Sequence, residues 1–445
     1  MKNNMSNVVT RVAPSPTGQM HIGTVRTALF NYLWAKKNGG QFLVRIEDTD
    51  AERNRSEWTE MIWKDYEWCG LIPDKKYIQS EHLARHTELL QKLVSEDKAY
   101  ISKEPSKDNS EKEVELVRFR NPGTTVTFND SIRGDISFDT SELGDFVIAR
   151  SLTEPLYHFA VVVDDADAGV THIIRGEDIL SSTPRQILIQ EALGFTRPQY
   201  VHLPLILSKD RKKLSKRNDV VSLEDYRNRG FIPEGIINYL ALLGWNPGTT
   251  EELFTIDELT ERFSLEQLQK SGAIFDDVKL KWFNHEHLKK LSSLEYEAKL
   301  KEFMERHGER APDYLIDIVP ELRNRAQTLG EASEALRAGE FSFMEKEITI
   351  DPLLLVQGAK ADSETIKKHL LAVKEMLGGM PETFTAEDAK EKIFPYATEV
   401  GRAAVLWPLR VALSGKEKSP DPFVLLGLLG KDISAARVAQ AAQLL

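Results

Sequence analysis

The sequence predicts an α/β fold: a parallel-sheet core that is interrupted by an inserted α+β domain and followed by an all-α C-terminal half. Three observations predict it. A strand, a helix and a second strand follow one another closely at the N-terminus, a stretch rich in Val, Ile, Phe and Thr comes later, and most segments beyond Ser222 have helical patterns. The length of 445 residues suggests about three domains of about 150 residues each.

The prediction of a parallel sheet depends on the N-terminal segments. Val8–Ala13 has the character of a short buried strand, and Ile22–Leu33 has apolar residues at helical spacing. Asn38-Gly39-Gly40 is a helix stop signal, after which Gln41–Ile46 is strand-like. A strand, a helix and a strand with short connections are the usual start of a parallel α/β sheet.

The prediction of an inserted domain depends on the middle of the chain. Ser102–Lys112 is polar without apolar periodicity, so we expect a loop there. The residues from Glu115 to about Ile174 favour strands because they are rich in Val, Ile, Phe and Thr. The other segments before Ser222 predict helices at Ser56–Gly70, Glu81–Lys98 and Thr183–Leu193, and a strand at Tyr200–Leu207.

We therefore expect five consecutive parts. The first and third form the α/β core, the second is the insertion, and the last two are helical; their bounds are 1–100, 101–155, 156–222, 223–300 and 301–445. Breaks such as Gly244–Pro247 and Ser419–Pro422 separate the helical segments.

The composition excludes several classes of protein. It is that of an ordinary soluble globular chain, with 41% hydrophobic and 29% charged residues. Met1–Asn7 is polar, unlike a signal peptide, and no apolar run is long enough to cross a bilayer. The single cysteine, Cys69, excludes an internal disulfide and a thiolate-rich zinc site. We therefore expect a cytoplasmic protein with no membrane partner.

Charge alone gives no nucleic-acid signature. The net charge of −11 argues mildly against such a partner, because phosphates attract Lys and Arg. The densest basic run is Lys209–Arg217, interrupted by one carboxylate, Asp210. A run like this is usually a solvated face, so its context must decide its role.

The first motif extends from Arg11 to Thr24 and reads Arg-Val-Ala-Pro-Ser-Pro-Thr-Gly-Gln-Met-His-Ile-Gly-Thr. It predicts a strand, a tight turn and a helix that begins near His21, whose N–H groups and dipole suit a polyphosphate. Gly23 would let a nucleotide approach the backbone, and His21 can donate to phosphate oxygens. A rigid turn with a surface histidine is the structural alternative, but the full string favours nucleotide binding.

The second motif is Lys213-Leu-Ser-Lys-Arg217, inside the basic run. Two lysines on a mobile loop could stabilise the triphosphate charge that grows during adenylyl transfer. A solvated loop is the alternative for so short a sequence. Its position, downstream of the first motif and just past a candidate strand, favours nucleotide binding.

Together these motifs resemble the HIGH and KMSKS signatures of class I aminoacyl-tRNA synthetases. Thr24 stands at the last HIGH position, a variation common in the bacterial glutamyl-tRNA synthetases, which this chain resembles further. That resemblance is strong from Arg11 to Arg217 and continues diffusely to Lys431; its additional segments are Arg26–Asn31, Arg45–Asp50, Ala160–Asp165, Ile174–Asp178, Thr183–Gln186 and Lys279–Asn284. It implies a Rossmann-type catalytic core, an insertion that binds the tRNA acceptor end, a helical stem-contact domain and a helical anticodon-binding domain.

The resemblance also implies an activity: glutamate is activated with ATP to glutamyl adenylate and transferred to the 3′ end of tRNA(Glu). The implied catalytic residues are His21, Lys213 and Lys216; glutamate would contact Arg11, Ser15, Glu47, Tyr157 and Arg175; and ATP would contact Thr17, Gly18, His21, Gly23, Ser215 and Lys216. Two guanidiniums suit a side-chain carboxylate, because glutamine would leave one charge poorly paired.

Structural alternatives remain open for two of the substrate-binding residues. Arg175 could form a structural ion pair with Glu177 or Asp178, and Tyr157 could belong to the core. Perturbed ionisable groups also occur in purely structural networks, so residue type alone does not decide.

Metals allow two further hypotheses. Glu47–Asp50 could bind a cation, although we prefer substrate contact for Glu47 and expect Mg²⁺ to arrive mainly with ATP. Some relatives carry a cysteine-rich zinc site in the insertion. Here that stretch has no cysteine, and His82 and His86 alone cannot complete a tetrahedral site, so we predict no zinc.

Several rival functions remain open. The same chemistry could also charge tRNA(Gln) with glutamate, which the sequence does not decide. A second rival is an adenylate-forming enzyme that modifies a base within tRNA. A shortened relative with that function lacks the long helical C-terminal half, so the length of this chain argues against it. A catalytically silent tRNA-binding paralogue is disfavoured by the set Arg11, His21, Glu47, Arg175 and Lys216. A glutaminyl-tRNA synthetase is disfavoured by the two arginines. We expect a monomer, as the family suggests.

Overall fold

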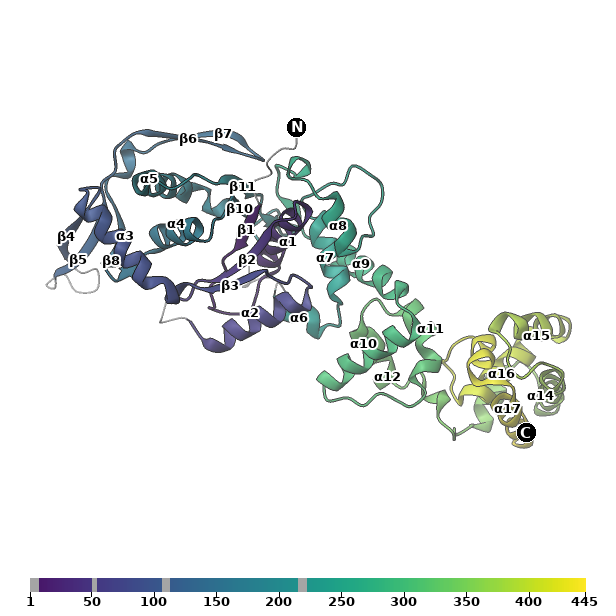
Figure 1. The fold of residues 1–445 in the computed structure, drawn as a ribbon. Helices are drawn as coiled ribbons and strands as arrows, with labels where there is room; N and C mark the ends of the chain where they lie inside the picture. Colours follow the sequence, from purple (N-terminus) through teal and green to yellow (C-terminus); the bar gives the residue numbers. More distant parts are fainter. Residues whose placement is uncertain (1–7, 50–53, 106–112, 215–221) are drawn as a thin grey trace. The chain divides into compact units, whose positions relative to one another are not determined.

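The computed structural model describes residues 8–49, 54–105, 113–214 and 222–445. Contacts divide the chain into two compact units, Met1–His287 and Leu288–Leu445, and each is described by itself. The first unit is α/β and the second is helical, as Figure 1 shows. The predicted fold class is therefore confirmed.

The central sheet of the first unit has seven strands within the described residues, in the order β3-β2-β1-β10-β11-β6-β7. All neighbours are parallel except β6 and β7, which form an antiparallel hairpin. The order reverses between β1 and β10, which leaves a crevice at the carboxyl ends of the strands. The bounds are β1 Val9–Val12, β2 Gln41–Ile46, β3 Lys75–Ile78, β6 Thr125–Asp130, β7 Gly134–Asp139, β10 His172–Gly176 and β11 Gln199–Leu203.

Helices cover both faces of this sheet. Phe42 and Val44 of β2 belong to a buried cluster with residues of α1 (Ile22–Lys37), α7 (Pro233–Leu242) and α8 (Ile256–Arg262). Leu43 between them belongs to a second cluster, with residues of α3 (Leu83–Ser95), α4 (Tyr157–Asp167) and α5 (Thr183–Leu193). Successive strand side chains point to opposite faces, so both faces are buried.

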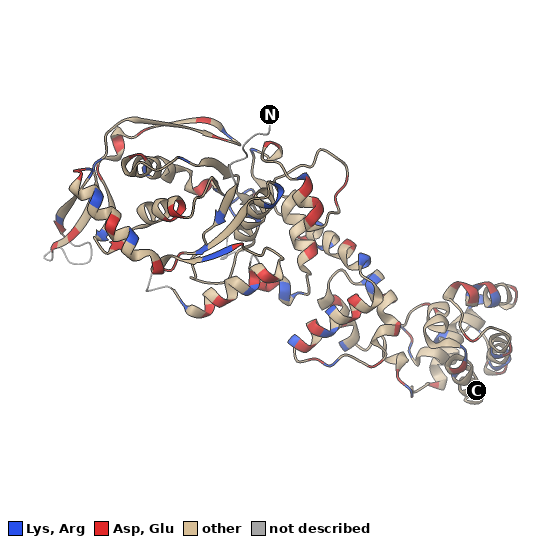
Figure 2. Cartoon of the chain, viewed as in Figure 1, with Lys and Arg blue, Asp and Glu red and all other residues tan. Residues whose placement is uncertain are grey.

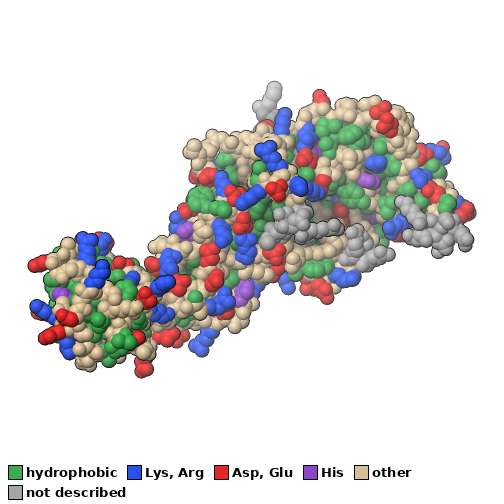
Figure 3. Space-filling view, turned by 180° about the vertical axis from the view of Figure 1, so that it is seen from behind, with side chains coloured by type: hydrophobic (Ala, Val, Ile, Leu, Met, Phe, Trp, Pro, Cys, Tyr) green, Lys and Arg blue, Asp and Glu red, His purple; other side chains and the backbone are tan. Residues whose placement is uncertain are grey.

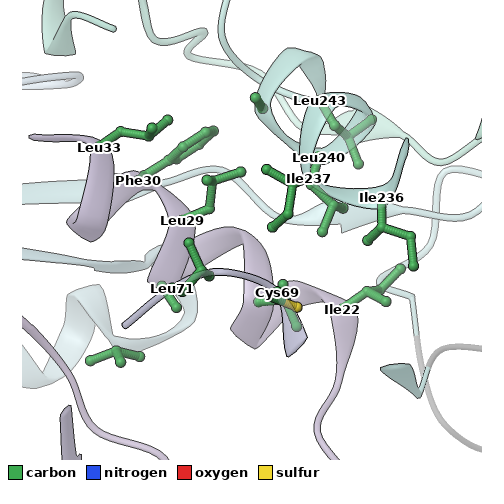
Figure 4. Packing of buried hydrophobic residues seen from close by; sticks show 14 of the residues in the cluster. Ile22, Leu29, Phe30, Leu33, Cys69, Leu71, Ile236, Ile237, Leu240 and Leu243 are labelled. Atoms are coloured by element: carbon green, nitrogen blue, oxygen red, sulfur yellow. The ribbon is translucent and has the colours of Figure 1, made fainter. Parts of the chain in front are cut away.

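Helix α1 follows the predicted spacing. Its buried residues include Ile22, Val25, Leu29, Phe30 and Leu33, which share one face because they lie three or four positions apart. His21 is its N-cap and Asn38 its C-cap, at the predicted stop signal. Figure 4 shows this apolar face against side chains of α7 and of the segment after α2 (Ser56–Trp68), namely Ile236, Ile237, Leu240, Leu243, Cys69 and Leu71. The packing holds the helix whose N-terminus reaches the site described below.

The insertion consists mainly of strands and is continuous with the core. An antiparallel sheet is formed by β4 (Ala99–Pro105), β5 (Glu113–Phe119), β8 (Phe146–Ser151) and β9 (Glu154–Pro155). The hairpin β6–β7 joins the central sheet instead, where Asp130 of β6 is paired with Tyr200 of β11. Pairing between strands so far apart along the chain has no local sequence signal.

The strand prediction for Glu115 to about Ile174 is wrong at Tyr157–Asp167, which form helix α4. Val161, Val162 and Val163 have β-branched side chains that favour strands. Each is at most 2% exposed, and burial against α3, α5 and the sheet offsets their modest helix propensity. The predicted helices near α2, α3 and α5 are confirmed.

The rest of the first unit contains a short parallel pair and two more helices. The pair is formed by β12 (Ile206–Leu207) and β13 (Ala273–Ile274), and the helices are α6 (Leu223–Asn228) and α9 (Asp277–Lys290). The division between the units falls inside α9.

The second unit is helical, which confirms the prediction for the C-terminal half. Its α-helices are α10 Ser293–Arg306, α11 Leu315–Arg325, α12 Leu329–Arg337, α13 Pro352–Gln357, α14 Ser363–Gly378, α15 Ala386–Val400, α16 Arg402–Ser414 and α17 Pro422–Gln443. Helix α17 contacts α14, α15 and α16. It therefore lies at the centre of the last four helices.

Charged residues of both signs are spread over both units, as Figure 2 shows. On the face drawn in Figure 3, acidic and basic side chains are interspersed. The net charge of −11 therefore says little about which surface a polyanion would meet. Among the described residues, no helix combines the length and the apolarity needed to span a bilayer.

Candidate active site

A pocket of about 710 Å³ lies at the carboxyl ends of the parallel strands. Its walls come from residues at the ends of β1, β2, β10 and β11 and from the starts of α1 and α4. This is the crevice at the switch point of the sheet, where open α/β sheets bind ligands. Eight residues predicted for the site line it: Arg11, Ser15, His21, Gly23, Glu47, Tyr157, Arg175 and Lys213.

Four predicted ATP-binding residues are not seen at this pocket. Thr17 and Gly18 lie in the turn between β1 and α1 and do not line it. The backbone N–H of Thr17 donates to the carbonyl of Ser15 at 2.9 Å. Ser215 and Lys216 lie outside the described residues, so their roles stay predictions.

The N-terminus of α1 is shaped by His21. Its Nδ1 accepts a hydrogen bond from the backbone N–H of Gly23 at 2.9 Å and caps the helix. In the neutral ring the proton is then on Nε2, which is a donor. A Cβ at position 23 would lie 3.1 Å from His21 Nδ1. Gly23 therefore leaves room for the histidine ring, in addition to its predicted role toward a nucleotide.

Arg11 is held by Asp165, a residue to which sequence analysis gave no role. Nε and Nη2 of Arg11 lie 3.1 and 3.0 Å from the two carboxylate oxygens of Asp165. Arg45 Nη1 lies 2.7 Å from Asp165 Oδ1, and its Nη2 lies 3.2 Å from Glu47 Oε1. Opposite charges therefore alternate through the network, and their mutual attraction offsets the cost of removing them from water. Two adjacent carboxylates, Asp164 and Asp165, at the end of a valine run were the signal that could have revealed it.

The two carboxylates of this network have opposite pKa shifts. Burial would raise the pKa of Asp165, but the charges of Arg11 and Arg45 outweigh burial and hold it below its ordinary value. Burial raises the pKa of Glu47, against the charges of Arg45 and Arg11. Asp165 is thus the permanent counter-ion of the arginines, whereas the charged form of Glu47 gains when a further cation enters the pocket.

Arg175 has neutral partners. Its Nε, Nη1 and Nη2 donate to His202 Nε2 at 3.1 Å, Gln186 Oε1 at 2.7 Å and Thr183 Oγ1 at 2.7 Å. Its side chain is buried, and burial lowers the pKa of the guanidinium. A buried cation with neutral partners is costly until an anion arrives.

The structural ion pairs considered for Arg175 do not form. Glu177 pairs with Arg133, and Asp178 Oδ2 lies 2.7 Å from Lys213 Nζ. In the described part of the chain, no carboxylate is within ion-pair distance of Arg175. The arrangement therefore favours a ligand carboxylate as its partner.

Tyr157, Ser15 and Lys213 complete the predicted lining. Tyr157 begins α4 and is 40% exposed, so the core interpretation is wrong. Ser15 is exposed at the turn after β1. Lys213 must exchange Asp178 for phosphate oxygens if it is to contact a triphosphate.

Arg26 also lines the pocket, although sequence analysis gave it no role. It donates to the carbonyls of Leu243 and Pro204, and burial lowers its pKa to about 10. Its basic side chain on the apolar face of α1 was the signal that could have revealed it. Arg26 ties α1 to the end of α7 and to the loop after β11.

The two carboxylates of the Glu47–Asp50 cluster that the structure describes have separate partners. Glu47 contacts Arg45, whereas Asp48 accepts from the N–H and hydroxyl of Ser80 at 2.9 and 2.7 Å. Asp50 lies outside the described residues. Within the part of the chain that is described, no group of three or more His, Cys, Asp or Glu side chains is placed to hold a metal ion.

Two family models match the chain. The model described as tRNA synthetases class I (E and Q), catalytic domain, matches residues 7–108 and 101–282. The model described as an anticodon binding domain matches residues 280–442. The chain is thus a member of the class I tRNA synthetases, with a catalytic domain and an anticodon binding domain.

Similarity to curated relatives and to a solved structure assigns the chain to a particular family within this class. The chain is 37% identical to the glutamate–tRNA ligase of Carboxydothermus hydrogenoformans, over 96% of this chain and 98% of that protein. It is also 37% identical to that of Aquifex aeolicus, over 98% of each. A crystal structure of a glutamate tRNA ligase from Elizabethkingia meningosepticum, in complex with its amino acid, matches with a TM-score of 0.81, 29% identity and 98% and 99% coverage. The chain belongs to the glutamate–tRNA ligase family.

Proposed function

We propose that the chain activates glutamate with ATP and transfers it to the 3′ end of tRNA(Glu). One observation carries the proposal: a single pocket places Arg11, Arg175 and Glu47 beside the N-terminus of α1. Two guanidiniums and a carboxylate suit an amino acid that has a second carboxylate and an ammonium group. The capped helix end suits the phosphates of a nucleotide.

Arg175 and Arg11 bind the side-chain carboxylate of glutamate in this proposal. Arg175 lacks a carboxylate partner among the described residues, whereas Asp165 already neutralises Arg11. Glutamine has an uncharged amide and would leave Arg175 buried without a counter-ion, which is costly. Glu47, which lines the same pocket, receives the ammonium group. Burial raises the pKa of its carboxylate against the charges of Arg45 and Arg11, so a further cation would favour the charged form. Ser15 and Tyr157 contact the same substrate.

ATP binds at the start of α1. The Nε2–H of His21 and the helix dipole meet phosphate oxygens, and Gly23 keeps the backbone accessible. Lys213 leaves Asp178 to join them. Thr17, Gly18, Ser215 and Lys216 are proposed from the sequence motifs alone. Mg²⁺ arrives on the nucleotide, since it retains waters and binds substrate phosphates. Metal analysis of the purified protein would test the prediction that it holds no zinc.

The chemistry has two steps. The α-carboxylate of glutamate attacks the α-phosphorus of ATP, a P–O bond forms, and pyrophosphate leaves with the electron pair of the bond that breaks. A terminal ribose hydroxyl of tRNA then attacks the acyl carbon, and AMP leaves. The protein supplies positioning and stabilisation of charge rather than a covalent intermediate.

The tRNA-binding parts are proposed from the family. Residues 101–155 bind the acceptor end, 223–300 the stem and 301–445 the anticodon. A family model named for anticodon binding covers 280–442, which supports the last assignment. Charging of tRNA(Gln) as well as tRNA(Glu) is the alternative. We propose a cytoplasmic monomer.

The test is ATP-dependent charging with labelled glutamate on separate tRNA(Glu) and tRNA(Gln) transcripts. We expect charging of tRNA(Glu) alone. Charging of both transcripts would retain the chemistry and replace the discriminating assignment with the relaxed one. Charging of tRNA(Gln) alone would indicate a specialised paralogue. No charging of either by folded protein with Mg²⁺ would overturn the enzymatic proposal in favour of a silent tRNA-binding protein.

A further inference from the structure

Three neighbouring strands of the central sheet each contribute one buried polar residue to a continuous row. Asp130 lies on β6, His202 on β11 and Arg175 on β10. His202 and Arg175 are partners in the strand register. His202 Nδ1 lies 2.7 Å from Asp130 Oδ2, and Arg175 Nε lies 3.1 Å from His202 Nε2. Their exposed fractions are 1%, 0% and 4%, so water does not compete for these contacts.

The direction of this hydrogen-bond chain follows from its charges. Burial would raise the pKa of Asp130, but hydrogen bonds from His202 and from the N–H groups of Ile132 and Arg133 hold it below its ordinary value. Burial lowers the pKa of His202, and the charges of Arg175 and Arg133 act in the same direction, against Asp130. The neutral imidazole donates from Nδ1 to the carboxylate, which leaves Nε2 to accept from Arg175.

We propose that Asp130 and His202 are positioning residues that orient the guanidinium of Arg175 toward the side-chain carboxylate of glutamate. His202 fixes Nε, while Gln186 and Thr183 hold the two terminal nitrogens. Each of these three nitrogens therefore has an assigned acceptor, and the guanidinium plane is set before the substrate arrives. The inference rests on the proposed function, because that function gives Arg175 its substrate.

The inserted segment thereby contributes to amino-acid selection. Asp130 Oδ1 accepts from the N–H groups of Ile132 and Arg133, both at 3.0 Å, and so also closes the turn of the β6–β7 hairpin. Arg133 in this turn pairs with Glu177, whose Oε1 accepts from the N–H of Leu205 at 2.9 Å. Leu205 lines the pocket. The hairpin turn thus reaches the pocket by two routes, through His202 and through Glu177.

The test uses full-length variants in the charging assay, with the KM for glutamate and the KM for ATP measured separately. His202→Asn keeps a donor near the position of Nδ1 but loses the acceptor for Arg175. His202→Gln places an amide oxygen near the position of Nε2 and keeps that acceptor. Asp130→Asn removes the charge with little change in shape. Asp135→Asn is the matched control, because this exposed carboxylate lies on β7 of the same hairpin.

We expect His202→Asn and Asp130→Asn each to raise the KM for glutamate by about tenfold or more, the usual effect of losing a buried hydrogen bond to a charged group. The KM for ATP should stay near wild type in both variants, and so should the thermal midpoint of His202→Asn. The thermal midpoint of Asp130→Asn should fall, because both carboxylate oxygens accept N–H groups and an amide nitrogen cannot. His202→Gln should recover part of the glutamate KM, and Asp135→Asn should match wild type. The double variant Asp130→Asn, His202→Asn should be no worse than the more affected single variant, because both act through Arg175.

Three results would overturn the inference. One is an unchanged glutamate KM in the two single variants. Another is a joint rise of both KM values with a lower thermal midpoint, which indicates a structural role only. The third is a double variant whose effect is the sum of the single effects. If His202→Asn does not fold, Asp130→Asn and His202→Gln supply the same comparison. Wild-type protein that charges no tRNA with glutamate would refute the proposed function, and with it the inference.

Discussion

Two arginines from neighbouring strands, Arg11 on β1 and Arg45 on β2, share one buried carboxylate at the end of α4, Asp165. The side chains of all three are at most 6% exposed. Without Asp165, two guanidiniums would lie close together in a medium that solvates them poorly. Arg45 has Glu47 and Asp164 as further partners, whereas the ion pair of Arg11 among the described residues is with Asp165. The charge of Arg11 therefore depends on Asp165.

Asp165→Asn tests this dependence. We expect a loss of about 3 kcal/mol or more in the free energy of unfolding at pH 7, because removing one partner leaves buried charges uncompensated. Urea unfolding would measure it. Asp167→Asn is the matched control on the same helix: its pair with Arg85 is exposed, and exposed pairs contribute only about 0–1 kcal/mol. Equal effects of the two substitutions would contradict the role of Asp165.

The wild-type protein and the Asp165→Asn variant should also differ in how their free energy of unfolding depends on pH. The pKa of Asp165 is lower in the folded protein than in the unfolded chain, where it is about 3.9. Its contribution is therefore present above pH 4 and is lost as the pH falls through the folded pKa. We expect the difference in unfolding free energy between wild type and Asp165→Asn to be constant near neutral pH and to shrink below about pH 4.

The proposed contact between Arg175 and glutamate can be tested with substrate kinetics. Arg175→Ala should raise the KM for glutamate by at least about tenfold while the KM for ATP changes little, because the lost contact is a charge-assisted one. Charging kinetics at varied glutamate would show this. Arg197→Ala, which removes an exposed arginine paired with Glu191, should leave both values unchanged. Unchanged glutamate kinetics in Arg175→Ala would remove Arg175 from the pocket.

At the scale of elements, the N-terminus of α1 combines a cap with a binding surface. His21 both accepts from the N–H of Gly23 and lines the pocket. The apolar face of the helix holds it against α7 through residues such as Leu29 and Leu240. The helix end is therefore placed by packing, whereas its chemistry comes from two residues of one turn.

Gly23→Ala separates these two contributions. Alanine favours a helix by about 0.5–1 kcal/mol over glycine, but a weakened His21 cap costs a similar amount, so stability should change little. The added Cβ would lie 3.1 Å from His21 Nδ1 and should displace the ring, so we expect turnover to drop. Gly378→Ala in α14 is the control, because its Cβ meets nothing within 4 Å. Turnover of Gly23→Ala equal to that of the control would refute a role for the ring position.

At the scale of the whole molecule, the chain divides into two compact units. The second unit buries apolar side chains of its own, such as Leu370 and Val373 of α14 and Leu426 of α17. A family model of its own also covers most of it. This separation places the pocket described above entirely within residues of the first unit.

Residues 288–445 should therefore fold alone. We expect a helical circular dichroism spectrum and a cooperative thermal transition, because a domain of this size can bury a sufficient core. Leu370→Asp in the same fragment should abolish the transition, since it buries a charge without a partner. A non-cooperative transition of the unaltered fragment would show that the second unit depends on the first.

Short-range patterns determined much of this protein from the sequence alone. The bounds of α1, its N-terminal histidine, the neighbouring strands and the helical C-terminal half follow from periodicity and capping, which act over a few residues. Eight of the predicted site residues line one pocket. Arg11, Glu47 and Arg175 meet there because β1, β2 and β10 are parallel and end at the same edge of the sheet.

Only the tertiary structure decided what surrounds those residues. Asp165 meets Arg11 across 154 positions, and His202 meets Asp130 across 72. Helix α4 forms despite its valines because burial offsets propensity. The hairpin β6–β7 joins the core sheet through pairing with a distant strand. Local sequence sets backbone preference and side-chain chemistry, whereas charge partners and burial depend on which distant segments pack together.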